Sequence, residues 1–188
     1  RVGLKSNFSI YDAADSQRLM ATVMRELDLD PKRYPPRSFS HQVSNLKNEL
    51  IDEETFAGRV GDTESETAAA SAQAAADAVL AQAYTMYQRR LRQANALDFD
   101  DLIMTTVNIL QAFPDVAEHY RRRFRHVLVD EYQDTNFAQY LIVKKLAELH
   151  EKICVVGDDA QSIYSFRGAN IDNILQQIDR MVGKIGRA

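Results

Sequence analysis

The chain has 188 residues, of which 45% are hydrophobic and 27% are charged, and its formal net charge is −4. This length and composition indicate one or two globular domains with enough apolar side chains for a core. The negative net charge excludes a general basic field, so any contact with nucleic acid must be local. No apolar stretch approaches about 18 residues, the length that suggests a membrane helix, and Arg1 does not begin a signal peptide.

The single cysteine, Cys154, lies inside an apolar run. We expect its thiol to be buried. One thiol without a partner excludes a disulfide framework and suggests a reducing compartment. Together with the lack of a long apolar stretch, this predicts a cytoplasmic protein that does not enter a membrane.

The first two predicted helices lie before residue 51. Asp12 or Asp15 can cap the first helix, whose apolar residues recur at helical spacing. These residues are Leu19, Met20, Val23, Met24 and Leu27. Prolines at 31, 35 and 36 then interrupt the chain. A second helical stripe follows and consists of Phe39, Val43, Leu46 and Leu50.

A polar stretch, residues 52–66, is predicted to be a loop. Thr63 and Glu66 near its end have the spacing of a capping box for the next helix. Residues 67–94 form the longest predicted helix, and helix propensity with close packing explains its alanine run. Residues 1–94 thus predict a mostly helical domain and, by themselves, indicate no function.

The hydrophobic pattern changes after residue 94. The short apolar runs HVLVD (126–130) and KICVVGD (152–158) are typical of strands buried on both faces. Between them, residues 136–152 have helical spacing, with Asn136 as a candidate N-cap and Gln139 three residues later. A strand, a helix and a strand predict two parallel strands joined by the helix. The expected fold is α/β, with a parallel sheet in residues 95–188 after the helical domain.

Carboxylates follow both predicted strands. Asp130 and Glu131 end the first strand, and Asp158 and Asp159 follow the second. In an open parallel sheet both groups lie at the edge where ligands bind. Clustered carboxylates repel one another unless a cation or a reacting proton is present, and this pattern fits Mg²⁺ held with the phosphates of a nucleotide. Acidic residues that merely cap a buried strand are the alternative.

The longer strings sharpen this interpretation. DEYQDTN (130–136) and VVGDDAQSIYSFRGA (155–169), in this order, resemble motifs II and III of superfamily 1 DNA helicases of the UvrD/PcrA/Rep type. ALDFDDLI (96–103) is similar to a further motif of that family, and NFSIYDAADSQRLM (7–20) resembles the start of its helical 1B subdomain. The resemblance covers nearly the whole chain. It implies a 1B-like subdomain in residues 1–94 and a partial RecA-like P-loop NTPase domain, 1A, in residues 95–188.

The resemblance also implies roles for residues of the nucleotide site. Asp130 would coordinate Mg²⁺, Glu131 would be the catalytic base that activates water, and Gln161 would contact the γ-phosphate of ATP and relay its presence to the DNA site. Gln161 has a structural alternative, in which its side chain only satisfies a backbone group.

A second group of residues would contact DNA. Tyr164 and Phe166 would lie on the path of single-stranded DNA, and Arg167 would contact DNA or a neighbouring domain. The two aromatic residues have a core role as their alternative. Upstream, RRRFRH (121–126) is either a phosphate contact or a solvated helix end whose charge offsets the helix dipole.

No GxxxxGK followed by Ser or Thr occurs in the sequence. This motif supplies the backbone cradle and the lysine that hold nucleotide phosphates. We therefore expect an inactive piece of a longer helicase. The parent is expected to be a 3′–5′ DNA helicase that uses ATP and Mg²⁺ in repair or replication. Its expected partners are single-stranded and duplex DNA, with repair or transcription proteins as candidates. The alternative is a non-catalytic helical module that binds DNA or a protein.

Overall fold

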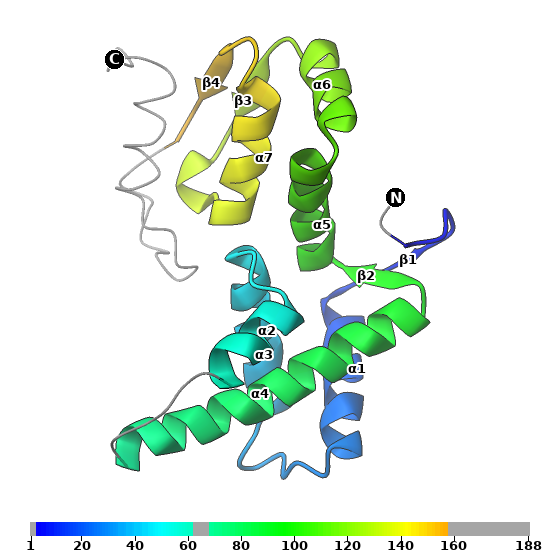
Figure 1. Ribbon diagram of the computed structural model, residues 1–188, viewed down its shortest axis with the longest axis vertical. Helices are drawn as coiled ribbons and strands as arrows, with labels where there is room; N and C mark the ends of the chain where they lie inside the picture. The colour runs from blue at the N-terminus through cyan, green and yellow to red at the C-terminus, as the bar shows by residue number, and fades with distance from the viewer. Residues whose placement is uncertain (1–2, 62–67, 158–188) are drawn as a thin grey trace. The chain divides into compact units, whose positions relative to one another are not determined.

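The computed structural model describes residues 3–61 and 68–157 (Figure 1). The chain divides into two compact units, residues 1–102 and residues 103–188, and each is described by itself. The division between a 1B-like and a 1A-like domain after residue 94 stays a prediction.

The first unit begins with β1 (Ser9–Tyr11) and continues with α1 (Ala13–Glu26), α2 (Pro36–Asn48), α3 (Glu53–Gly61), α4 (Ala68–Gln93) and β2 (Ala96–Asp98). The helix α5 (Phe99–Ala112) follows β2 directly. Asp12 caps α1, because its Oδ1 accepts a hydrogen bond of 2.8 Å from the Asp15 amide. The three helices predicted in residues 1–94 correspond to α1, α2 and α4, although the bounds of the second differ from the prediction.

Two details of this unit differ from the prediction. The stretch after residue 51 is not entirely a loop, because α3 forms there. Its start is stabilised by Asp52, whose Oδ1 accepts from the Thr55 amide at 2.7 Å, and by two glutamates in the first turn, near the positive end of the helix dipole. The second helix begins earlier than predicted, at Pro36, and ends before Leu50, whose φ of 60° is left-handed. The predicted Thr63–Glu66 capping box lies outside the described residues.

The core of the first unit lies between α1, α2 and α4. Its residues recur at helical spacing on each helix, which is why three amphipathic helices pack together. The buried members include Met20, Val23 and Met24 of α1, Phe39 and Val43 of α2, and Leu80, Tyr84, Tyr87 and Leu91 of α4.

A pair of short parallel strands joins the two ends of the helical stretch. β1 pairs with β2 in the register Ser9–Ala96, Ile10–Leu97 and Tyr11–Asp98, and the two lie side by side in Figure 1. Neither strand was predicted, because three residues are too few to show an alternating pattern.

The second unit contains the remainder of α5, followed by α6 (Pro114–Arg123), β3 (Val127–Val129), the short 3₁₀ helix η1 (Tyr132–Asp134), α7 (Phe137–Ala147) and β4 (Ile153–Val155). β3 and β4 are parallel, with Val127 opposite Ile153 and Val129 opposite Val155. Asn136 and Gln139 form a capping box at the start of α7. The predicted strand–helix–strand unit and the α/β class are therefore confirmed.

The prediction that these strands are buried on both faces is wrong. Val129 and Val155 pack with the buried Tyr132 and Tyr140 on one face. On the other face Leu128 is 78% exposed, and its register partner Cys154 is exposed too. Successive residues of a strand point to opposite faces, so each strand has one packed and one open side. The expectation of a buried Cys154 thiol is wrong for the same reason.

Among the helices of residues 3–61 and 68–157, none is long and apolar enough to cross a membrane.

Candidate nucleotide-binding edge and a buried charge cluster

The carboxyl ends of β3 and β4 lie next to each other. The Val156 amide donates to the Val129 carbonyl at 2.8 Å, and the Tyr132 amide donates to the Val156 carbonyl at 3.0 Å. Asp130, which follows β3 directly, is therefore at the edge that β3 shares with β4. Asp158 and Asp159, the carboxylates predicted to join it there, lie outside the described residues.

Asp130 and Glu131 form an exposed turn at this edge. Glu131 has φ 51° and ψ 43°, a left-handed backbone that non-glycine residues adopt infrequently. The Glu131 amide donates to Asp130 Oδ1 at 2.9 Å, which holds the Asp130 side chain against the turn. Among the described residues, Asp28, Leu50, Asn95 and Glu151 also have a positive φ, so this backbone alone does not mark Glu131 as catalytic.

The turn rests on two buried tyrosines. Tyr132 is 6% exposed and packs with Tyr140, which is 1% exposed, together with Val129, Leu141 and Val155. Burial raises the pKa of both phenols, so both stay neutral. The turn that carries Asp130 and Glu131 is thus anchored by a small core of its own.

The donor set at this edge fits a magnesium ion that arrives with a nucleotide. The part of the chain that the structure describes contains no group of three or more His, Cys, Asp or Glu side chains that could hold a metal. Mg²⁺ in nucleotide sites is usually held by one or two carboxylates together with phosphate oxygens and water, so such a group is not required. Asp130 supplies an exposed carboxylate of the required kind.

The other predicted site residues are Gln161, Tyr164, Phe166 and Arg167. All four lie outside the described residues, so their roles stay predictions.

Two of the three arginines in the last turn of α6, Arg121 and Arg122, contact other residues of the protein. Arg121 Nε donates to the Lys145 carbonyl at 2.8 Å and its Nη2 lies 2.5 Å from Glu148 Oε2, which ties α6 to α7. Arg122 pairs with Glu118 at 2.6 Å within α6. These contacts, in the last turn of the helix, favour the helix-end interpretation over phosphate binding.

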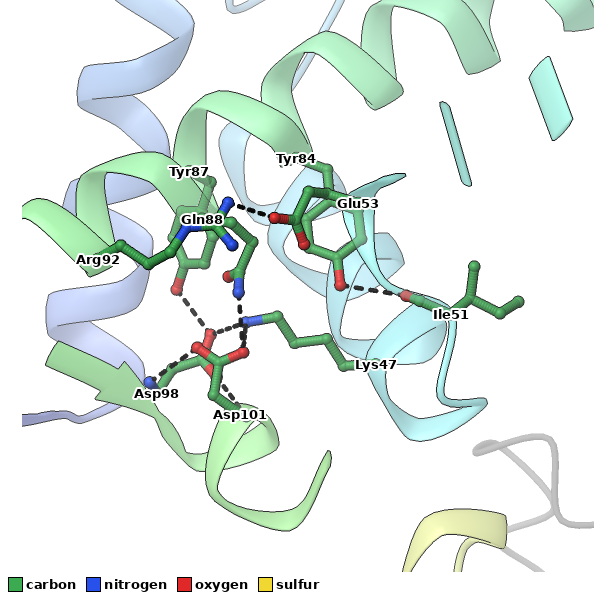
Figure 2. Close-up of polar contacts among 9 residues, drawn as sticks. All are labelled: Lys47, Ile51, Glu53, Tyr84, Tyr87, Gln88, Arg92, Asp98 and Asp101. Carbon is green, nitrogen blue, oxygen red and sulfur yellow. Dashed lines mark hydrogen bonds and ion pairs between the residues drawn. The ribbon is translucent and has the colours of Figure 1, made fainter. Parts of the chain in front are cut away.

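A second polar site lies in the first unit, within the ALDFDDLI motif (Figure 2). The side chain of Lys47, from α2, is fully buried, and its Nζ lies 2.6 Å from Asp98 Oδ2 and 2.8 Å from Asp101 Oδ1. From α4, the Tyr87 hydroxyl donates to Asp98 Oδ2 at 2.9 Å and Gln88 Nε2 donates to Asp101 Oδ1 at 3.1 Å. We call Lys47, Asp98 and Asp101 the charge cluster.

The two aspartates of the charge cluster also form a capping box for α5. Asp98 Oδ1 accepts from the Asp101 amide at 2.8 Å, and Asp101 Oδ2 accepts from the Asp98 amide at 3.3 Å. This pairing satisfies amides that the first turn of a helix otherwise leaves without partners. The sequence contained a signal for it, since an Asp followed three residues later by another acidic residue resembles a capping box.

For each of the two carboxyl groups, burial raises the pKa and the charge of Lys47 lowers it. For Asp98, burial favours the neutral form, but Lys47 and the hydrogen bonds outweigh it and the pKa is lowered. For Asp101, burial prevails, aided by the charge of Asp98, and the pKa is raised. Lys47 therefore favours the charged form of both carboxyl groups, and burial of both side chains opposes it.

Polar contacts next to the charge cluster tie α4 to the start of α3. Glu53 is buried and forms an ion pair with Arg92, and the Tyr84 hydroxyl donates to the Ile51 carbonyl at 3.1 Å (Figure 2). Burial raises the pKa of Tyr84 and of Tyr87, so both are neutral donors.

Comparison with known proteins identifies the family. Residues 1–181 match the family described as the UvrD/REP helicase N-terminal domain. The ATP-dependent DNA helicase UvrD1 of Mycobacterium tuberculosis strain H37Rv is 56% identical over 180 residues, covering 92% of this chain and 22% of the relative. The ATP-dependent DNA helicase PcrA of Bacillus subtilis is 45% identical over 175 residues, covering 93% and 22%. The chain spans about a fifth of the length of these curated relatives, and it belongs to the UvrD/REP helicase N-terminal domain family.

Proposed function

We propose that the chain is part of an ATP-dependent DNA helicase that moves 3′ to 5′ along single-stranded DNA in DNA repair or replication. Two relatives that share about half of its residues are named ATP-dependent DNA helicases, which supports ATP use and DNA binding. The structural observation that carries the proposal is the exposed Asp130–Glu131 turn at the end of β3, directly beside the end of β4. A cytoplasmic location and contacts with repair or transcription proteins belong to the same proposal.

The proposed chemistry assigns a separate task to each carboxylate. Asp130 provides an oxygen ligand for Mg²⁺, which, when bound, neutralises charge on the nucleotide phosphates. Glu131 orients a water and takes its proton as the water attacks the γ-phosphorus and the bond from this phosphorus to the bridging oxygen breaks, which releases ADP and phosphate. The exposure of both residues in one turn at the end of β3 supports this assignment.

The remaining roles come from the family motifs. Gln161 senses the γ-phosphate. Tyr164 and Phe166 stack on bases of single-stranded DNA, and Arg167 contacts the same strand or a neighbouring domain. Stacking on aromatic rings tolerates any sequence, as a translocating enzyme requires.

The test replaces the proposed base. In a helicase of the relatives' full length that carries this sequence, Glu131→Gln should leave ATP and DNA binding nearly unchanged and lower steady-state ATP hydrolysis by about two to four orders of magnitude. Glu118→Gln, which removes a carboxylate from α6, is the matched control and should hydrolyse ATP normally. A Glu131→Gln enzyme with a near wild-type rate would show that another group is the base.

A second function is favoured by the self-contained core of α1, α2 and α4. In this case the chain is a non-catalytic module that binds duplex DNA or a protein partner. The Glu131→Gln measurement described above distinguishes the two functions, because ATP hydrolysis does not depend on Glu131 if the chain is a non-catalytic module.

A further inference from the structure

The charge cluster is not explained by stability alone. The side chains of Lys47, Asp98 and Asp101 are 0%, 9% and 2% exposed. Removing three charges from water carries a large desolvation penalty, and apolar side chains of similar volume often stabilise a core at least as well. Buried charges favour one particular arrangement of the chain, because any other arrangement leaves a buried charge without a partner.

The contacts of the charge cluster connect distinct parts of the first unit. Lys47 comes from α2, and Tyr87 and Gln88 come from α4, whereas Asp98 ends β2 and Asp101 lies in the first turn of α5. The helical donors precede the domain boundary predicted after residue 94, and both acceptors follow it. Figure 2 shows Lys47 reaching from α2 to both carboxylates.

Each carboxylate performs two tasks at once. One oxygen of Asp98 accepts from Lys47 and Tyr87, and the other accepts from the Asp101 amide. One oxygen of Asp101 lies against Lys47 and accepts from Gln88, and the other accepts from the Asp98 amide. The bonds that shape the first turn of α5 and the bonds that hold this turn on α2 and α4 therefore use the same two side chains. A shift of the turn along either helix would break the contacts that these side chains make with Lys47, Tyr87 or Gln88.

We propose that Lys47, Asp98 and Asp101 form a lock that fixes the first turn of α5 in one position on α2 and α4, so that the helices before residue 94 and the start of α5 move as one body. Lys47 is the positioning residue of this lock, since it alone contributes positive charge to both carboxylates among the contacts described.

Hydrogen exchange on the 188-residue chain tests the lock. Lys47→Met and Asp101→Asn each remove one charged member, and the control Glu54→Gln removes an exposed carboxylate from the first turn of α3 and leaves the charge cluster in place. We expect the amides of residues 98–103 to exchange about tenfold faster or more in the first two variants. The amides at the centres of α1 and α4 should keep their wild-type protection, and the control should resemble the wild type throughout.

The combined variant Lys47→Met, Asp101→Asn tests whether the two residues act as a unit. Members of one lock act as a unit, so the double variant should exchange about as fast at residues 98–103 as Lys47→Met does. Independent contributions, with fold-changes that multiply, would contradict the lock.

Three other outcomes would overturn the proposal. The first is unchanged exchange at residues 98–103 in both single variants. The second is an equal loss of protection throughout residues 13–102, which would make the charge cluster an ordinary part of the core. The third is failure of the nearly isosteric Asp101→Asn variant to fold, because a lock on one turn is not required for α1, α2 and α4 to pack.

Discussion

Lys47 lies between two buried carboxylates, and the protonation of each carboxyl group should affect stability differently. Asp98 is compensated by Lys47 and has a lowered pKa, whereas burial of Asp101 raises its pKa above the ordinary value of 3.8. The two groups interact, so they titrate as a pair. As the pH falls, the first proton binds above pH 3.8, near the raised pKa of Asp101.

The sign of the pH dependence follows from this difference. A group whose pKa is higher in the folded chain binds its proton more tightly there, so the free energy of unfolding should rise as the pH falls through the raised pKa of Asp101 toward 3.8. The contribution of Asp98 is present above 3.8 and is lost as the pH falls through its lowered folded pKa. Urea unfolding at a series of pH values should show the rise in the wild type and its loss in Asp101→Asn. Identical profiles for the two proteins above pH 3.8 would contradict the assignment.

The roles of some individual residues could be predicted from the sequence, and those of others could not. The position of Asp130 and Glu131 after a strand was predictable, because an apolar run followed by acidic residues is a local pattern. The role of Lys47 was not, because its partners Asp98 and Asp101 lie more than 50 positions away and a buried lysine looks like a surface lysine in sequence. Long-range pairing of charges leaves no periodic signal.

Helices and strands in this chain depend on their end residues as much as on their apolar faces. Asn136 is buried at the start of α7, where its Oδ1 accepts from the Gln139 amide at 2.9 Å and its own amide donates to Gln139 Oε1 at 3.0 Å. This box was predicted from spacing. In contrast, α3 was missed because its start depends on Asp52 and its apolar stripe is short, and the three-residue strands β1 and β2 carry no pattern of their own.

Asn136→Ala should destabilise α7 by about 0.5–2 kcal/mol, the usual effect of removing an N-cap. The helix should lose amide protection in its first turns before the rest of the unit does. Hydrogen exchange of the α7 amides measures this loss. Asn136→Ser keeps an oxygen acceptor at the cap and should retain most of the protection, so an equally large effect in both variants would show that the cap bond is not the cause.

The sequence as a whole combines acidic residues at the end of β3 with the absence of a phosphate-binding motif. Asp130 and Glu131 are exposed, the net charge is −4, and no GxxxxGK followed by Ser or Thr occurs. Carboxylates alone repel the phosphates of ATP, and in P-loop enzymes a backbone cradle and a lysine overcome this repulsion.

The 188-residue chain should therefore show no saturable binding of Mg-ATP at micromolar concentration. Isothermal titration calorimetry of the chain measures this, and a helicase of the relatives' full length that carries this sequence serves as the positive control. A micromolar dissociation constant for the chain would mean that it completes a phosphate site in another way, for example by association of two copies.

The parallel pairing of β1 with β2 has an evolutionary consequence. Since Ser9–Tyr11 lies beside Ala96–Asp98, the polypeptide leaves this strand pair at Asp12 and returns to it at Asn95. A parallel pair always needs a long connection, and here a complete helical assembly serves as that connection. Because the positions where the chain leaves and rejoins the strand pair are neighbours, the segment between them can be exchanged as a whole. The entropy of closing a loop rises only slowly with its length, so inserts of different sizes can connect these positions. Recombination at these two positions could replace the helical module with another one of different size or specificity and leave the strands that receive it paired as before.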